Sequence, residues 1–189
     1  HIASERLSVI HLETKLDTAI MDAALSGKDI VLTGNPGDGK THVIRLLKDK
    51  LESTGKPICI ELDASTLSND DIYLKWKKAR ERRTPFVIAI NAAILYSVYR
   101  KYPDFTPIKS AYSQMSHAVV FHDEVNESSD LVVFDLSKRE VLTADILKKA
   151  IEKLTDATHY TECTSCPLNE SCDVHKNCRL LNSTLFQER

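Results

Sequence analysis

A glycine-rich loop followed by lysine and threonine, at residues 34–41, constrains this chain more than any other feature. Its residues, GNPGDGKT, match the pattern G-x-x-x-x-G-K-[ST], in which backbone N–H groups surround phosphate oxygens. The apolar run 29–33 predicts a strand before the loop, and the apolar spacing in 42–48 predicts a helix after it. A strand, a loop and a helix N-terminus in this order direct N–H groups at an anion. We therefore expect the loop to bind the phosphates of a nucleotide.

The chemistry of the motif gives several positions a role. The glycines let the backbone approach oxygen atoms closely. Lys40 is expected to reach the β- and γ-phosphates and to act in catalysis, and Thr41 is expected to bind Mg²⁺. Asp38 is expected to point away from the phosphates, because like charges repel. The predicted contact set is Gly34, Asn35, Pro36, Gly37, Asp38, Gly39, Lys40, Thr41 and His42.

Length and charge set the frame for this loop. The chain has 189 residues, enough for one α/β domain with a small appendage, and a formal net charge of -2, which gives no global basic field for nucleic acid. The sequence contains neither an apolar run long enough for a bilayer nor a signal peptide, so we expect a cytoplasmic protein without membrane contact. It begins at His1 rather than Met and ends at Arg189, so we expect a piece of a longer protein.

Strand and helix patterns alternate along the chain. Strands are predicted at 29–33, 58–63, 86–90 and 131–135, and helices at 8–26, 41–52, 69–83, 92–100 and 143–154, with an irregular region at 102–126 that includes short strands. This alternation predicts an α/β fold, a three-layer P-loop NTPase core with a parallel central sheet. The core is expected to cover residues 1–157, followed by a cysteine-rich knuckle at 158–182 and a tail at 183–189.

The basic run 75–83 on one predicted helix fits either a solvated helix face or a contact with nucleic acid. Trp76 in the same run fits core packing or stacking on a base. Both pairs of interpretations stay open at this stage.

Polar side chains follow the predicted strands, where a parallel sheet binds its ligands. Glu61 and Asp63 end the second strand, Asn91 the third and Asp135 the fourth. One of Asp63 and Asp135 is expected to bind Mg²⁺ or polarise the attacking water, although each also fits a simple turn cap. Residues 138–139, Lys-Arg, are candidates to sense the phosphate or to reach a neighbouring subunit.

The chain order resembles that of the AAA+ ATPases, in which the third strand carries an Asp-Glu pair and the fourth a sensor residue. The matching third-strand positions here are Asn91 and Ala92, neither of them acidic. Asn91 could hydrogen-bond a metal-bound water, whereas Ala92 cannot act as a base. Three interpretations remain: hydrolysis through Asp63 or Asp135, a nucleotide switch or scaffold with slow turnover, or an engineered substitution at Ala92.

Four of the five cysteines lie near the C-terminus, and Cys59 is expected to be a buried core thiol. A C-x-x-C pair followed by further cysteines suits tetrahedral structural Zn²⁺, which would supply folding energy to a short polar segment. The predicted ligands are Cys163, Cys166, Cys172 and Cys178, with His175 or His159 as alternatives for the fourth. An iron–sulfur cluster also fits four thiolates.

Several motifs together resemble a bacterial group of ATP-binding proteins that includes the DNA-phosphorothioation-dependent restriction ATPase. They are Gly-Asp-Gly-Lys-Thr-His at 37–42, Leu-Asp-Ala-Ser at 62–65, Ile-Ala-Ile-Asn at 88–91, and Cys-x-x-Cys-Pro with later Cys, Asn and Leu-Leu at 163–181. The resemblance implies an ATPase of antiviral defence or DNA restriction. It would act as a homo-oligomer or in a multi-protein complex that contacts DNA. The helical lid of an AAA+ module would lie beyond Arg189. A small-molecule kinase is a further hypothesis, for which neither an acceptor pocket nor an arginine-rich lid is recognised.

Overall fold

The computed structural model describes residues 11–120, 130–139, 143–181 and 183. The chain divides into two compact units. One comprises Glu13–Arg139, and the other joins His1–Leu12 with Glu140–Arg189. Among the described helices, none is long and apolar enough to cross a membrane.

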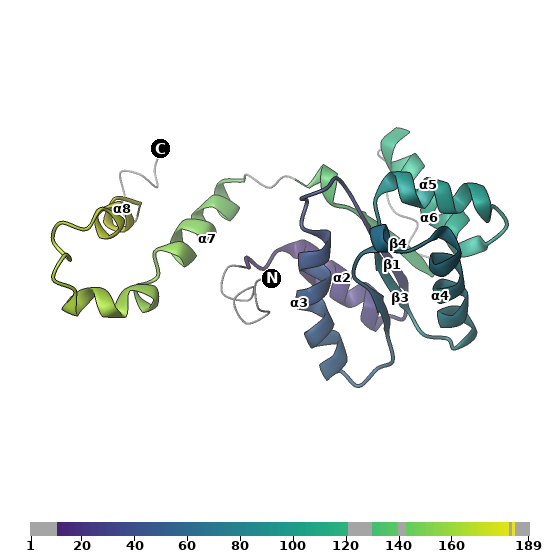
Figure 1. Ribbon diagram of the computed structural model, residues 1–189, viewed down its shortest axis with the longest axis horizontal. Helices are drawn as coiled ribbons and strands as arrows, with labels where there is room; N and C mark the ends of the chain where they lie inside the picture. The colour runs from purple at the N-terminus through teal and green to yellow at the C-terminus, as the bar shows by residue number, and fades with distance from the viewer. Residues whose placement is uncertain (1–10, 121–129, 140–142, 182, 184–189) are drawn as a thin grey trace. The chain divides into compact units, whose positions relative to one another are not determined.

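Glu13–Arg139 forms an α/β unit around a parallel sheet of four strands in the order β2-β3-β1-β4, which confirms the predicted fold class at this level (Figure 1). The strands are β1 (Asp29–Thr33), β2 (Cys59–Glu61), β3 (Phe86–Ala89) and β4 (Leu131–Asp135). The helices are α2 (Lys15–Leu25), α3 (Lys40–Ser53), α4 (Asn69–Glu81), α5 (Ala92–Lys101) and α6 (Thr106–Val120). Short 3₁₀ helices occupy Ala64–Thr66 and Leu136–Lys138.

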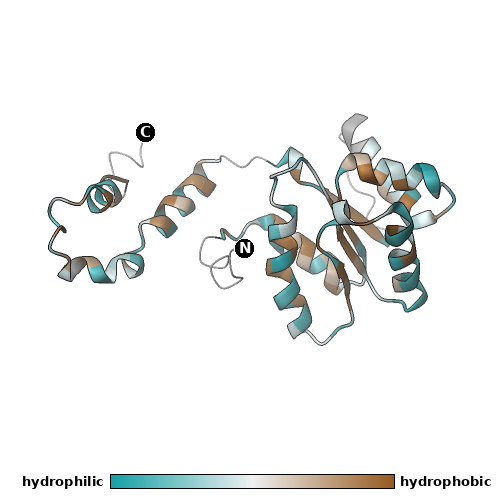
Figure 2. Cartoon of the chain, viewed as in Figure 1, coloured by the Kyte–Doolittle hydropathy of each residue, from teal (hydrophilic) through white to brown (hydrophobic). Residues whose placement is uncertain are grey.

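Two hydrophobic clusters cover the two faces of the sheet. On one face α2 and α3 pack against Ile30 and Leu32, and on the other α4, α5 and α6 pack against Val31. This division follows from the alternation of side chains along β1. Because both faces are covered, the strands are mainly hydrophobic, and their polar residues lie at the strand ends (Figure 2).

The prediction of an irregular region at 102–126 holds for residues 102–105 and was wrong for residues 106–120. Residues 106–120 form α6, whereas 121–126 lie outside the described residues. Ile108, Ala111 and Met115 follow one another at helical spacing, and all three pack on the α4–α6 side of the sheet. The many polar residues between them lie on the other helix faces, which hid this stripe.

Several predicted element boundaries also need correction. The first helix begins at Lys15, not near residue 8, because Thr14 and Asp17 form a capping box there; residues 8–10 lie outside the described part. The strand predicted at 58–63 covers only Cys59–Glu61. The helix predicted at 69–83 ends at Glu81, and Ser68 caps its start. Cys59 is half-buried rather than fully buried, and burial raises the pKa of its thiol.

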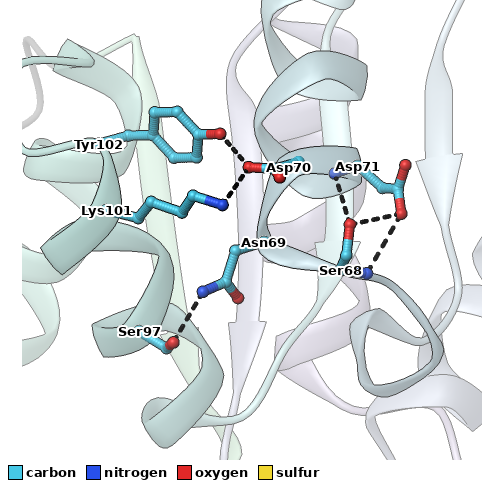
Figure 3. Close-up of polar contacts among 7 residues, drawn as sticks. All are labelled: Ser68, Asn69, Asp70, Asp71, Ser97, Lys101 and Tyr102. Atoms are coloured by element: carbon cyan, nitrogen blue, oxygen red, sulfur yellow. Dashed lines mark hydrogen bonds and ion pairs between the residues drawn. The ribbon is translucent and has the colours of Figure 1, made fainter.

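Helices α4 and α5 are joined by exposed polar contacts at their ends (Figure 3). The Tyr102 hydroxyl donates to Asp70 Oδ1, and Lys101 Nζ lies 2.6 Å from the same oxygen. These hydrogen bonds, from Lys101 first, lower the pKa of Asp70, and the bond to Asp70 raises the pKa of Tyr102 to about 12. The ring of Tyr102 also stacks on the ring of Tyr73 in α4, with the two centroids 4.0 Å apart. We infer that these contacts fix the register of the two helices.

The unit His1–Leu12 with Glu140–Arg189 contains α7 (Ala144–Leu154), a 3₁₀ stretch at Ala157–Ser165 and α8 (Asp173–Leu181). Thr143 caps α7, accepting from Ile146 N at 3.2 Å. Among the apolar side chains of α7, Ile151 is buried, whereas Leu147 and Leu154 are exposed. Lys153 Nζ donates to the carbonyl of His11 and joins the two segments of this unit.

A buried carboxylate, Asp29, ties three elements together at the amino end of the sheet. It accepts a hydrogen bond from Trp76 Nε1 at 2.8 Å and another from Phe86 N at 2.9 Å. Arg80 Nε lies 3.0 Å from Asp29 Oδ2, an ion-pair distance without the direction of a hydrogen bond. Burial is the largest influence on Asp29 and raises the pKa of its carboxyl. Trp76 is fully buried, which confirms core packing for this residue.

Replacing Asp29 tests this contact. We expect Asp29→Ala to lower the free energy of unfolding by about 3–5 kcal/mol, because two buried donors lose their acceptor and Arg80 loses the nearer of its two carboxylate partners. Urea unfolding followed by circular dichroism measures the change. Asp130→Ala is the matched control: Asp130 is exposed and lies 3.7 Å from Arg80, so we expect a loss below about 0.5 kcal/mol. Equal losses in both variants would contradict the anchoring role of Asp29.

Candidate functional site

The loop between β1 and α3 has a backbone that depends on its glycines. Gly34, Gly37 and Gly39 have φ values of 141°, 92° and 87°, conformations that residues with a Cβ rarely adopt. At Gly34 the space is closed as well, since a Cβ would lie 2.7 Å from Asp38 Oδ2 and 3.1 Å from Ser137 N. The beginning of the loop therefore packs directly against the chain that leaves β4.

Helix α3 begins without a side-chain cap. Its N-cap is Gly39, whereas Ser68, Asn91 and Thr143 cap α4, α5 and α7 with their side-chain oxygens. The first backbone bond of α3 runs from Val43 N to Gly39 O at 2.9 Å. The N–H groups of a first helical turn have no partner within the helix, and the helix dipole makes this end attractive to anions. The N-terminus of α3 therefore presents donors at the end of the glycine loop.

Charged side chains of the loop are bound to its own backbone. Lys40 Nζ donates to the carbonyls of Gly34 and Asn35 at 2.9 and 2.8 Å. Asp38 Oδ2 accepts from Asn35 N at 2.5 Å. The carboxylate of Asp38 is thus held against the first half of the loop, while the ammonium group of Lys40 reaches back across it.

The two candidate carboxylates at the strand ends both cap short turns. Asp63 Oδ1 accepts from Ser65 N at 2.9 Å. Asp135 Oδ1 accepts from Ser137 N at 3.0 Å and from Ser137 Oγ at 2.6 Å. The turn-cap interpretation is therefore confirmed for both residues. These bonds use only one oxygen of each carboxylate, so they do not decide which residue could bind a metal. The position of each residue around the loop is the remaining criterion.

The end of β3 carries no acid. Asn91 Oδ1 accepts from Ile94 N at 2.8 Å and caps α5, and Ala92 is exposed next to it. Glu61, at the end of β2, forms an ion pair with Lys75 of α4. The carboxylate of Glu61 is thus directed to α4, and it lines neither of the cavities described next.

Among the described residues, two cavities that adjoin the loop can be compared. The lysine-side cavity, of about 400 Å³, is lined by the second half of the loop with Lys40, Thr41 and His42, and by Asp63. The tyrosine-side cavity, of about 590 Å³, is lined by the first half of the loop and by Asp135, together with residues of α5 and α6. Pro36 and Asn91 line both. The predicted loop residues and Asp63 therefore surround one cavity, and Asp135 belongs to the other; Lys138 and Arg139 line neither.

Three residues of α6 that line the tyrosine-side cavity, Tyr112, Met115 and Ser116, were not predicted from the sequence. Neither were Thr33 and Ser137 in the same cavity, nor Ser65 in the lysine-side cavity. The i, i+3, i+7 spacing of Ile108, Ala111 and Met115 would have revealed α6. Which face of α6 meets the loop depends on the packing of three helices, and local spacing does not contain that information.

The cysteine-rich segment brings part of its predicted cluster together. Cys166 N donates to the carbonyl of Cys163 at 3.3 Å, so the C-x-x-C pair forms a tight turn. The Tyr160 hydroxyl donates to the carbonyl of Leu154 at 2.8 Å. A hydrogen bond with the thiol of Cys178 is the largest influence that raises the pKa of Tyr160. Within the described residues, no three His, Cys, Asp or Glu side chains gather in a group that could hold a metal ion. The zinc site therefore stays a prediction.

No protein-family model matches the chain, and comparisons with curated proteins and with solved structures gave no match either. The function is consequently inferred from the geometry and chemistry of the loop and its two cavities.

Proposed function

We propose that the loop at residues 34–41 binds the triphosphate of a nucleotide, with ATP and Mg²⁺ as the expected ligands, and that the chain is a P-loop ATPase domain. The observation that carries this proposal is the uncapped N-terminus of α3 directly after three glycines with positive φ. Lys40 adds a cation at this point, held by the loop carbonyls. Donors, a positive helix end and an ammonium group together favour a multiply charged anion.

Position favours Asp63 over Asp135 as the carboxylate that assists Mg²⁺. Asp63 lines the lysine-side cavity together with Thr41, whose hydroxyl is the expected metal ligand. Asp135 lines the other cavity. Thr41 and Asp63 would hold the metal, which would offset part of the negative charge of the phosphates.

Slow turnover is the second candidate function, a nucleotide-dependent switch or scaffold. The specific observation in its favour is the end of β3, where Asn91 is engaged as a helix cap and Ala92 supplies no functional group. The motif resemblance described above favours a bacterial defence or DNA-processing protein that uses nucleotide binding to drive assembly within a larger complex. The basic run of α4 gives such a complex an exposed cationic surface.

We also propose that the cysteine-rich segment binds one structural Zn²⁺ through Cys163, Cys166, Cys172 and Cys178. The tight C-x-x-C turn supports this ligand set, because it holds Cys163 and Cys166 close to each other along the chain. All four thiols are free, so none is committed to a disulfide.

Loss of the P-loop cation tests nucleotide binding. We expect Lys40→Ala to raise the Kd of ATP by about tenfold or more, because a charge-assisted contact to the phosphates is lost. Isothermal titration calorimetry with Mg²⁺ measures the Kd. Lys48→Ala is the matched control, since Lys48 is an exposed residue of the same helix that pairs with Glu52 at 3.7 Å. Unchanged affinity in Lys40→Ala would overturn the assignment of the loop.

The metal role of Asp63 is tested by Asp63→Asn, because asparagine keeps an oxygen that can cap the Ser65 turn and removes only the charge. We expect ATP to bind with similar affinity without Mg²⁺, and the gain in affinity on adding Mg²⁺ to fall about tenfold. Asp135→Asn, which keeps its own turn cap, serves as the comparison. A loss of Mg²⁺ dependence in Asp135→Asn alone would reverse the assignment. ATP turnover in the same variants distinguishes a motor from a switch.

Metal analysis tests the cysteine site. We expect about one Zn²⁺ per chain by mass spectrometry, and loss of this metal in a variant with both Cys163→Ser and Cys178→Ser, because serine does not replace a zinc thiolate. Cys59→Ser, outside the segment, should keep the metal. Iron with sulfide in place of zinc would favour a cluster, and a metal-free protein purified without chelator would eliminate the site.

A further inference from the structure

The end of α4 and the turn that follows it carry a concentration of positive charge. Residues 75–83 include six cationic side chains and one acid, Glu81. Half of the cations already have a partner within the fold: Lys75 with Glu61, Arg80 with Asp29, and Lys77 with the ring of Tyr73. We refer to the other three, Lys78, Arg82 and Arg83, as the α4 basic cluster.

The α4 basic cluster is exposed and is not neutralised by the fold. Among the described residues, no acidic side chain forms an ion pair with any of its three members, and all three are exposed. Lys78 and Arg82 are four residues apart on one helix face, a spacing at which like charges repel. A helix C-terminus attracts cations, but its partial charge is only about half an elementary charge. The cluster carries three charges, of which Glu81 can offset one, so an excess of positive charge remains.

Arg83 has a backbone conformation that glycine usually supplies. Arg83 N donates to the carbonyl of Arg80 at 3.0 Å, and Thr84 N donates to the carbonyl of Ala79 at 2.9 Å. These two bonds form a Schellman motif, in which the residue after the C-cap has a positive φ. Arg83 has a φ of 54° and is the only residue other than glycine with a positive φ in the described part of the chain. Glycine would suit this turn better, so the fold alone does not explain the arginine.

The surroundings of the cluster favour a duplex over a single strand as its partner. Single-stranded nucleic acids bind largely by stacking their bases on aromatic side chains. The aromatic residues of α4 are already engaged: Trp76 is fully buried, and the ring of Tyr73 contacts both Tyr102 and Lys77. Cations without a free aromatic ring suit the regularly spaced phosphates of a duplex, which bind without regard to base sequence.

We propose that the α4 basic cluster binds the phosphate backbone of duplex DNA. The guanidinium groups of Arg82 and Arg83 match the geometry of phosphate oxygens, and Lys78 adds a third cation beside them. A bound phosphate would relieve the repulsion between Lys78 and Arg82. The cluster lies at the end of α4 that meets Asp29, at the amino edge of the sheet, whereas the glycine loop follows the carboxyl end of β1. DNA binding at this surface therefore does not depend on the proposed nucleotide site.

Salt-dependent binding of the full chain to a short labelled DNA duplex, followed by fluorescence anisotropy, tests the inference. We expect a plot of log K against log salt concentration with a slope of about -3, because about 0.9 counterion is released for each of three phosphate contacts. A triple variant with Lys78→Ala, Arg82→Ala and Arg83→Gly should bind about tenfold or more weakly at low salt and lose most of this slope. A charge-matched control removes three exposed lysines of α6, α7 and α8: Lys109→Ala, Lys148→Ala and Lys176→Ala. The control should change the affinity by less than about threefold.

The single variant Arg83→Gly separates DNA binding from a structural role. Glycine adopts the left-handed backbone without strain, so we expect the melting temperature to stay at or above that of the wild type. The Kd of the duplex should nevertheless rise about threefold to tenfold, because one phosphate contact is lost. Arg83→Lys keeps the charge without the planar guanidinium group, and its Kd should lie between the two. Unchanged DNA affinity in a stable Arg83→Gly variant would contradict the role of Arg83.

The outcomes also separate this inference from the proposed function. If the wild type binds no duplex at low salt, or if the triple variant and the control lose equal affinity, the inference is overturned. Tighter binding of single-stranded DNA, duplex RNA or polyglutamate than of duplex DNA would assign the cluster to another partner and overturn it as well. ATP binding is measured in the same proteins. Lost DNA binding with unchanged ATP affinity in the triple variant supports the inference, and a wild type that binds DNA but no ATP would refute the proposed function alone.

Discussion

Parallel pairing of β1 with β3 on one side and β4 on the other is the constraint on which the rest of the structure depends. It places the glycine loop, Asn91 and Asp135 at one edge of the sheet, because parallel strands end on the same side. The buried carboxylate of Asp29 secures the opposite edge, where it accepts hydrogen bonds from β3 and from α4. The apolar strands thus form a frame with a buried polar anchor at one end and the ligand-facing groups at the other.

Two features of the loop support the proposal that it binds phosphate. Glycines with positive φ bring the backbone close to the ligand, and α3 begins where no side chain competes for its N–H groups. Other helices of the chain, such as α4 and α5, begin with a side-chain oxygen in this position. The difference between a capped and an uncapped helix start is small in energy, about 1 kcal/mol. The missing cap nevertheless leaves the first N–H groups of α3 without a side-chain acceptor, as the proposed phosphate site requires.

Local patterns were sufficient to predict most of the strands, the loop and the helix after it, since each depends on periodicity and on glycine positions. They failed at α6, where a narrow apolar stripe of Ile108, Ala111 and Met115 lies among polar residues. The consequence was larger than one helix, because α6 forms a wall of the tyrosine-side cavity. The sequence also did not predict that Asp63 and Asp135 line different cavities. The order of the strands in the sheet determines which cavity each strand end lines, and strand order depends on long-range contacts rather than on neighbouring residues.

The hydrogen bonds within the loop imply that a bound phosphate would replace some of them. Lys40 bonds to the carbonyls of Gly34 and Asn35, and a phosphate must draw the ammonium group away from at least one of them. Such charge-assisted bonds contribute about 1.5–3 kcal/mol, and phosphate oxygens replace them with stronger ones because they carry full charge. Asp38 remains at the loop through its bond to Asn35 N, so its charge opposes an anion on that side.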